Sequence, residues 1–232
     1  MFREVITKAC ETEFGHDVVA GVASGIQAIQ SVQQAQPDIL ILDLLLLDID
    51  GFTVIEQLRA GGCRTKILVL SAYSDDFTVF RIERAQVQGF VDKRQNAIAE
   101  LREALQVLGA GGTYFSPSFE SARRARHADP KSFDKVLSES EQRILCLIGE
   151  GQTDGEIALR FKISPRTAQT HRHNILWKLG IGSTPKLIAY AMRHGFTPSN
   201  PPLISSRAAA SSRAWTEAHL QPEPRCAVSE KM

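Results

Sequence analysis

Cysteine, long apolar runs and net charge are all scarce in this chain. The 232 residues include four cysteines, with no CxxC pair and no histidine at zinc-ligand spacing, which argues against a disulfide scaffold and a structural zinc site. The longest apolar run, residues 39–47, is interrupted by Asp43 and is too short to span a bilayer. The first residues lack the apolar stretch of a signal peptide. We therefore expect a cytoplasmic protein with no membrane partner.

The near-neutral total hides an uneven charge distribution. The chain has 27 basic and 26 acidic side chains, yet residues 1–111 carry a net charge of −5 and residues 136–197 carry +3. The length fits one large domain or two small ones. This asymmetry gives a weak preference for a polyanion partner of the second half.

Residues 1–111 alternate between strand-like and helix-like segments. We predict strands at residues 17–23, 38–43, 66–70 and 89–91. Helical spacing of apolar residues occurs at residues 2–14, 24–34, 52–58, 75–85 and 98–108. The alternation predicts an α/β fold in which helices cover a parallel sheet.

Two segments lack a core pattern. Residues 112–135 are polar, carry five basic residues and are predicted to form an interdomain linker with a helical turn. Residues 198–232 are rich in Pro, Ser and Ala and are predicted to be a disordered tail. The predicted organisation is a first domain at 1–111, a linker at 112–135, a second domain at 136–197 and a tail at 198–232.

The second domain carries three helix-start signals within about thirty residues. These signals are Ser138-x-x-Glu141, Thr153-x-x-Glu156 and Ser164-Pro165. Only Lys162 and Ile163 separate the second helix from the third. Such a tight turn predicts an all-α domain of helix-turn-helix architecture.

The third of these helices has an apolar face and a face of hydrogen-bonding side chains. The apolar face is formed by Ala168, Ile175 and Leu179, and the opposite face by Arg166, Gln169, Thr170, His173 and Trp177, flanked by Asn174. Any surface helix has a polar outer face, but a preceding helix and a sharp turn favour insertion into the DNA major groove.

Residues 137 to about 196 closely resemble the LuxR-type DNA-binding domain. The resemblance lies in Leu137-Ser-Glu-Ser-Glu, Glu150-Gly151, Glu156-Ile157-Ala158 and the run from Ser164 to Gly180. It implies that Gln169, Thr170 and His173 contact bases, and that Thr167, Arg172, Asn174 and Lys178 lie near phosphates or support the helix. It also implies a homodimer on double-stranded DNA, paired through the helix at residues 185–194. Trp177 stands where the family usually has a basic residue.

Polar side chains follow three strands of the predicted sheet. Asp43 ends the most apolar strand, Ser71 ends the next, and Lys93 follows the last strand, three residues after Phe90. The carboxyl ends of parallel strands meet at one edge of a sheet. A carboxylate, a hydroxyl and an ammonium together suit phosphoryl transfer to an aspartate.

Residues 1 to about 110 resemble the receiver domain of two-component response regulators, which has a flavodoxin-like parallel sheet. The resemblance implies that Asp43 accepts the phosphoryl group and binds Mg²⁺, that Ser71 and Phe90 are switch residues, and that Lys93 contacts the phosphate. It also implies a cognate sensor histidine kinase as partner. The whole chain is then expected to be a non-enzymatic transcription regulator controlled by phosphorylation of Asp43. Leu47 replaces a proline that is usual in the family.

The first strand of the receiver fold has no counterpart in the chain. In the family that strand ends in an acidic pair that holds Mg²⁺, whereas Met1-Phe2-Arg3-Glu4 matches the start of the first helix. The strand is central in the 2-1-3-4-5 order, so its loss leaves backbone groups of its neighbours unpaired. Two interpretations stay open: the protein starts further upstream, or the receiver is degenerate and the regulator acts without phosphorylation.

A different class of function is suggested by one short motif. Asp48-Ile-Asp50-Gly-Phe-Thr53 resembles the nucleophile motif of haloacid-dehalogenase-type phosphatases, which are Mg²⁺-dependent hydrolases. That interpretation requires a strand ending at Asp48 and leaves the second domain unexplained. The regulator is therefore the favoured hypothesis.

Overall fold

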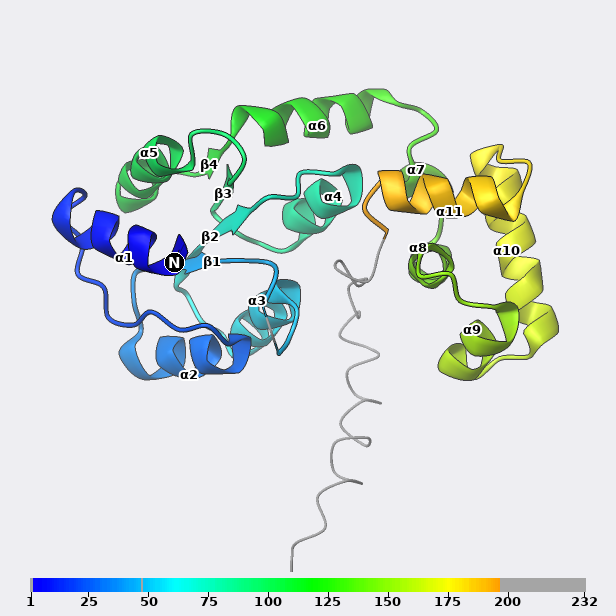
Figure 1. Cartoon of the computed structure of the whole chain (residues 1–232), viewed down its shortest axis with the longest axis horizontal. Coiled ribbons are helices and arrows are strands. Elements are labelled where there is room, and N and C mark those ends of the chain that lie inside the picture. Colours follow the sequence, from blue (N-terminus) through cyan, green and yellow to red (C-terminus); the bar gives the residue numbers. More distant parts are fainter. Residues whose placement is uncertain (1, 47, 197–232) are drawn as a thin grey trace, which may run out of the picture. The chain divides into compact units, whose positions relative to one another are not determined.

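The structure is a computed structural model that describes residues 2–46 and 48–196 (Figure 1). Leu47 and the predicted tail at 198–232 lie outside the described residues. The strands are β1 (Ile39–Leu42), β2 (Lys66–Ser71), β3 (Gly89–Asp92) and β4 (Tyr114–Phe115). The helices are α1 (Phe2–Thr12), α2 (Gly25–Ala35), α3 (Gly51–Ala60), α4 (Asp76–Arg84), α5 (Ala97–Gly109), α6 (Pro117–Ala128), α7 (Phe133–Val136), α8 (Glu139–Gly149), α9 (Asp154–Phe161), α10 (Pro165–Leu179) and α11 (Thr184–Arg193).

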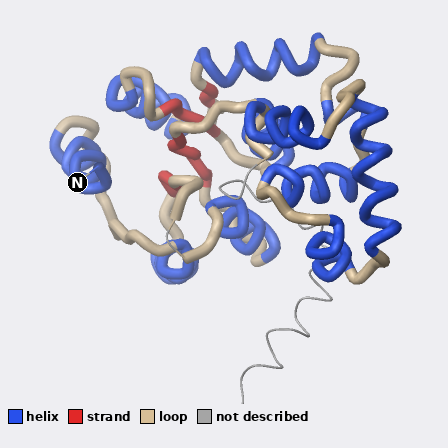
Figure 2. Tube along the Cα trace, turned by 45° about the vertical axis from the view of Figure 1, so that its right-hand side comes forward, coloured by secondary structure: helices blue, strands red, loops and turns tan. Residues whose placement is uncertain are grey.

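The four strands form one parallel sheet in the order β1-β2-β3-β4. In the register of this sheet, Leu42 lies beside Val69 and Ser71 lies beside Asp92. Because the paired strands are parallel, β1, β2 and β3 all end at the same edge. Figure 2 shows the strands running between helices of the first part of the chain.

Helices cover both faces of the sheet, as the alternating sequence predicted. Leu68 and Leu70 of β2 pack with α1 and α5 on one face, whereas Ile67 and Val69 pack with α2, α3 and α4 on the other. Successive strand residues point to opposite faces, so an uninterrupted apolar strand is buried on both sides. The receiver-like α/β fold predicted from the sequence is confirmed.

The prediction of a strand at residues 17–23 is wrong. The structure has no strand in this segment, and Val19 is 61% exposed. Among the described residues, β1 pairs with β2 alone, so its other edge is open. In the flavodoxin-like order the 17–23 strand would pair only with the missing central strand. Without that neighbour its backbone has no ladder to join, whatever its β propensity.

The segment predicted as a linker is more structured than a helical turn. It contributes β4, which pairs with β3, and the 12-residue helix α6. Phe119 and Phe133 are fully buried. The buried Arg126 of α6 forms ion pairs with Glu83 of α4 and Asp134 of α7. Isolated apolar residues in a charged sequence give no periodic signal, which is why the sequence predicts only a linker with a helical turn.

All three predicted helix starts of the second domain are confirmed. Ser138 Oγ accepts from the Glu141 N–H, and Glu141 Oε2 accepts from the Ser138 N–H at 2.8 Å. Thr153 and Glu156 repeat this reciprocal arrangement at the start of α9. Ser164 caps α10. Each cap satisfies N–H groups that the first helical turn leaves unpaired.

The turn between α9 and α10 fixes the helix-turn-helix geometry. Lys162 ends α9 in the left-handed conformation with a φ of 54°, which reverses the chain within two residues. Ile144, Ile157 and Ile175 from three different helices are fully buried in one cluster. In the described ranges, no helix is both long enough and apolar enough to cross a membrane.

The capping hydrogen bonds predict a difference between two helix starts. Thr153→Ala removes a side-chain acceptor from the start of α9 and is expected to lower the free energy of unfolding by about 1 kcal/mol. Ser183→Ala at the start of α11 is the matched control, because Ser183 makes no side-chain capping bond. Urea unfolding of both variants measures the difference. Equal losses in the two variants would contradict this account of the caps.

Candidate functional site

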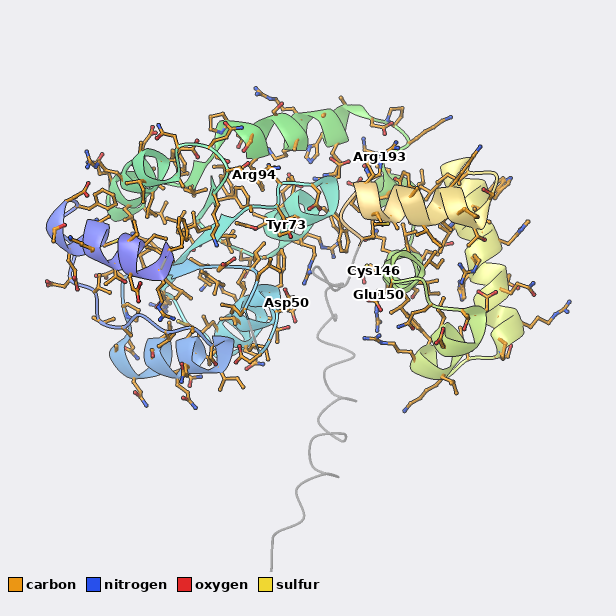
Figure 3. The ribbon with its side chains drawn as sticks, in the orientation of Figure 1. Asp50, Tyr73, Arg94, Cys146, Glu150 and Arg193 are labelled. Atoms are coloured by element: carbon orange, nitrogen blue, oxygen red, sulfur yellow. The ribbon has the colours of Figure 1, made fainter. Side chains whose placement is uncertain are left out.

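Three predicted site residues lie where strands of the sheet end. Asp43 directly follows β1, Ser71 is the last residue of β2, and Lys93 directly follows β3. Tyr73 and Arg94, which lie in the loops after β2 and β3, are labelled in Figure 3. The parallel register therefore gathers a carboxylate, a hydroxyl and an ammonium, of which Asp43 and Lys93 are fifty residues apart in sequence.

Asp43 and Lys93 form an ion pair at this edge. Lys93 Nζ donates to Asp43 Oδ2 at 2.5 Å, and Asp43 Oδ1 accepts from the Leu45 N–H at 3.0 Å. The Asp43 side chain is 37% exposed, so solvent still reaches the carboxylate. An accessible carboxylate held beside a fixed positive charge is suited to accept a phosphoryl group, because the ammonium offsets the charge that transfer adds.

Ser71 lies beside this pair without bonding to the carboxylate. Its side chain is buried, and Oγ accepts from the Tyr73 N–H at 3.1 Å. The Ser71 carbonyl accepts from the Lys93 N–H at 2.9 Å. The hydroxyl therefore holds the turn after β2, and its link to Lys93 runs through the backbone.

Phe90 is fully buried under helix α6. Its ring lies 5.1 Å from the ring of Phe119, which stacks on Phe115 of β4. One residue before Lys93, the buried Asp92 accepts a hydrogen bond from Ser118 of α6 at 3.0 Å. The end of β3 is thus tied to α6 by an aromatic contact and a hydrogen bond.

Asp48 closes the amino end of α2 and is not available as a nucleophile. Its carboxylate accepts from Ser24 Oγ at 2.6 Å and from the N–H groups of Gly25 and Ile26 at 2.8 and 3.0 Å. The hydrogen bond from Ser24, together with these backbone bonds, holds the pKa of Asp48 well below its usual range. Strand β1 ends at Leu42, well before Asp48, so the phosphatase hypothesis finds no support.

Asp50 points away from the sheet edge toward α4. It pairs with Arg81 at 3.0 Å, and the Arg81 guanidinium lies 3.6 Å from the centre of the Phe52 ring. Burial raises the pKa of Asp50, although the Arg81 charge opposes that shift. The pair is a buried structural contact between α3 and α4.

The residues present do not fit the predicted Mg²⁺. In the part of the chain that the structure describes, no group of three His, Cys, Asp or Glu side chains could hold a metal ion. Asp43 brings one carboxylate, which is already bonded to Lys93, while Asp48 and Asp50 are engaged elsewhere. A hard cation such as Mg²⁺ needs several oxygen ligands.

Helix α10 presents a solvent-exposed, largely polar face. Its exposed residues are Arg166, Thr167, Gln169, Thr170, His173, Asn174 and Trp177. Ala168 and Ile175 on the other side are fully buried. Within the described residues, the side chains of Gln169, His173 and Asn174 make no hydrogen bond. They are therefore free to meet an external partner.

The two threonines of this face are engaged locally. Thr167 Oγ1 lies 2.8 Å from the Oγ of the capping residue Ser164, and Thr170 Oγ1 donates to the Arg166 carbonyl at 2.9 Å. A hydroxyl that donates to the backbone keeps lone pairs for an outside donor. Thr170 can thus still accept a hydrogen bond from a base.

Two cations that were predicted to lie near phosphates or to support the helix form ion pairs inside the domain. Arg172 Nε donates to Asp154 Oδ1 at 2.7 Å, and its terminal nitrogen donates to the Gln152 carbonyl at 3.0 Å. Lys178 Nζ donates to Glu141 Oε2 at 2.7 Å. Burial acts to raise the pKa of Glu141, but the bonds from Lys178 and Ser138 hold that pKa below its usual range. Both cations support α10 in the structure.

Asp154 and Glu141 are the residues that sequence reasoning missed. The sequence analysis gave Glu141 only a capping role and did not single out Asp154, although each residue binds a cation of α10. The pairs span 18 and 37 residues, so no local spacing reveals them. A second role for a first-turn acid becomes visible only in three dimensions.

Helix α4 contacts the second domain. The ring of Phe77 stacks on the ring of Phe196 with centroids 4.2 Å apart, and the Phe77 N–H donates to the His194 carbonyl at 3.1 Å. His194 Nδ1 lies 2.6 Å from Asp76 Oδ2. Because α4 begins after the loop that Ser71 starts, the sheet edge and the helical domain meet at this helix.

The Asp48 contacts predict a pH-dependent stability difference. A carboxyl group with a lowered folded-state pKa stabilises the fold above its ordinary pKa of about 4, and this stabilisation is lost as the pH falls through the folded-state value. Asp48→Asn should therefore lower the melting temperature at neutral pH, and the deficit should narrow below about pH 4. Thermal unfolding across this range tests it, with the exposed Asp17→Asn as the matched control. A deficit that is the same at every pH would refute the role assigned to the Asp48 charge.

Each half of the chain matches a known protein family. Residues 1–106 match the response regulator receiver domain, and residues 135–191 match the luxR family of bacterial regulatory proteins. The chain is 30% identical over 194 residues to the response regulator protein VraR of Staphylococcus aureus, an alignment that covers 84% of this chain and 92% of VraR.

Solved structures agree with this assignment. A complex of the two-component response regulator RcsB with DNA is 25% identical, with a TM-score of 0.56, and the match covers 83% of this chain and 93% of RcsB. RcsB from Salmonella enterica serovar Typhimurium, bound to a promoter in the presence of the phosphomimetic BeF₃⁻, is 25% identical with a TM-score of 0.55. That match covers 81% of this chain and 90% of RcsB. The chain therefore belongs to the response regulators that combine a receiver domain with a LuxR-family DNA-binding domain, a family of transcription regulators that are not enzymes.

Proposed function

We propose that this protein binds duplex DNA through α10 and that phosphorylation of Asp43 controls this binding. The observation that carries the proposal is the presence in one chain of the Asp43–Lys93 pair and of an exposed recognition-type helix. The ion pair is suited to accept a phosphoryl group, and the helix is suited to bind DNA. The cognate partner that supplies the phosphoryl group is a sensor histidine kinase.

Base recognition falls to Gln169, Thr170 and His173. These side chains lie on the exposed face of α10, and the amide of Gln169 can pair bidentately with adenine in the major groove. Arg166 stands exposed in the first turn, where the positive end of the helix dipole also attracts phosphate. Arg172 and Lys178 act mainly by holding α10 in place.

Helix α11 is the proposed dimer contact. Pro185, Ala189 and Met192 are exposed along one side of this helix, whereas Leu187 and Ala191 are buried in the domain. A two-fold pair formed through small and flexible apolar residues would place two α10 helices on two half-sites.

Phosphorylation would act through two sets of contacts that begin at the sheet edge where Asp43 lies. Added negative charge at Asp43 strengthens the existing pair with Lys93, recruits the Ser71 hydroxyl and so changes the loop before α4. Helix α4 carries Phe77, which packs against the helical domain. The end of β3 leads through Phe90 to α6. Together these contacts connect Asp43 with the DNA-binding domain.

A second candidate is a regulator that binds DNA without phosphorylation. Two observations on the described residues favour it: they do not fit Mg²⁺, and among them one edge of β1 has no partner strand. The phosphorylated regulator, by contrast, would need a further strand at that edge. Paired in parallel with β1, this strand would end beside Asp43, because parallel strands end together. Such a strand, ending in two acidic residues, would supply the missing oxygen ligands.

The two candidates differ in the chemistry of Asp43. We expect the 232-residue chain to take up phosphate from acetyl phosphate only weakly. A chain extended upstream of Met1 by a short Val/Ile/Leu run ending in two acidic residues should take it up readily when Mg²⁺ is present. Intact-mass measurement detects the added group, and Asp43→Asn in each background is the control. Uptake by neither chain, with DNA binding retained, would leave the phosphorylation-independent regulator.

Base recognition predicts unlike effects for two substitutions in α10. Gln169→Ala should weaken binding by about 1–3 kcal/mol for sites that carry the preferred base at one position, and much less for sites that lack it. Lys178→Ala should weaken all duplexes alike, because it loosens the support of the helix. Affinities for a panel of single-base variants of a selected duplex measure both. A uniform loss for Gln169→Ala would remove this residue from base recognition.

A further inference from the structure

Trp177 is a large aromatic residue in an unexpected place. Its side chain is 79% exposed. At 100° per residue, Arg166, His173 and Trp177 follow one another along a single line of α10. Trp177 therefore ends the same exposed face that carries the residues proposed to contact bases.

Exposure of one apolar side chain is common and proves nothing alone. The position of Trp177 is what requires explanation. Within the described residues, no aromatic ring stacks on Trp177 and no cation lies over its ring. The indole contributes nothing visible to the domain core, which Ala168 and Ile175 serve on the opposite face of α10.

The cations on the same half of α10 as Trp177 are engaged in ion pairs. The two cations in the second half of α10 are Arg172 and Lys178, and both are bonded to carboxylates of the same domain. Their side chains are 12% and 33% exposed. A duplex that docks on this half of the helix would thus meet an indole in place of an unpaired cation.

The helical rise places Trp177 at the rim of a DNA groove. Trp177 lies eight residues beyond Gln169, which is about 12 Å along the helix axis. The major groove of B-DNA is also about 12 Å wide. When Gln169 reaches a base edge inside the groove, Trp177 lies where the groove wall is formed by sugar and phosphate.

We propose that Trp177 contacts the DNA backbone. The ring packs against deoxyribose, and the indole N–H donates to a phosphate oxygen, which suits a side chain with an apolar body and one polar donor. This inference rests on the proposed function of α10. Because the indole is neutral, the contact releases no counterion, unlike a lysine or arginine contact. Part of the affinity is then independent of salt.

Fluorescence tests the contact directly. The chain has two tryptophans, Trp177 and Trp215, so Trp215→Phe leaves Trp177 as the single reporter. The probe is a duplex selected from a random pool by the wild-type protein. Adding it should change the emission of Trp177 and protect it from acrylamide quenching. If the variant binds the duplex and neither signal changes, Trp177 does not contact DNA.

Substitutions separate the neutral contact from a charged one. Trp177→Ala should weaken binding about ten-fold, through loss of ring burial and of one hydrogen bond, and leave the salt dependence unchanged. Trp177→Arg should recover affinity at low salt and steepen the slope of log K against log salt by about 1. Trp177→Phe keeps a ring without the N–H and should lie between wild type and Trp177→Ala. Val19→Ala, which trims an exposed apolar residue of the receiver, is the matched control.

The outcomes distinguish this proposal from the function on which it rests. Wild-type affinity in Trp177→Ala, with its fold checked by circular dichroism, overturns the backbone contact and leaves DNA binding by α10 intact. If wild type selects no duplex from the pool, DNA binding itself fails and the contact fails with it. Unchanged DNA affinity combined with loss of dimerisation would assign Trp177 to a protein interface.

Discussion

Two ion pairs hold the recognition helix in place. Asp154 at the start of α9 binds Arg172, and Glu141 at the start of α8 binds Lys178. Glu141 is also half of the capping box that begins α8, so one carboxylate fixes the start of one helix and the end of another. Removing one partner of such a pair would leave a poorly solvated charge, which is costly. The placement of α10, and which of its side chains stay free, depends on these two contacts.

The same pairs explain the character of the exposed face. Arg172 and Lys178 orient the helix through these pairs. The exposed face is made of amide, hydroxyl, imidazole and indole groups, with Arg166 at its start. Such a face favours directional hydrogen bonds over long-range attraction. The domain's modest net charge of +3 agrees with a surface that selects DNA by contact geometry more than by charge.

In the receiver, the controlling constraint is the parallel register of β1, β2 and β3. It places Asp43 and Lys93 within 2.5 Å although they are fifty residues apart. Strand β3 contacts α6 through Phe90 and Phe119, and α4, which follows β2, contacts the helical domain through Phe77. Among the described residues β1 pairs with β2 alone, and its other edge lies next to Asp43.

Local signals were enough to predict the caps at Ser138, Thr153 and Ser164, because each is encoded within four residues. The strand at 17–23 could not be judged this way, since a strand forms only where a neighbour offers hydrogen bonds. Helix α6 was missed because its burial comes from single residues such as Phe119. Arg172 was assigned a place near phosphate, or a supporting role, and only the structure shows the carboxylate that holds it.

The central claim is that the exposed face of α10 selects the DNA sequence. The most direct measurement is selection of duplexes from a random pool by the wild-type protein and by a variant in which Gln169, Thr170 and His173 are all alanine. The account predicts that wild type enriches a two-half-site sequence and that the variant, still folded, enriches none or a different one. Enrichment of the same sequence by both proteins would contradict it.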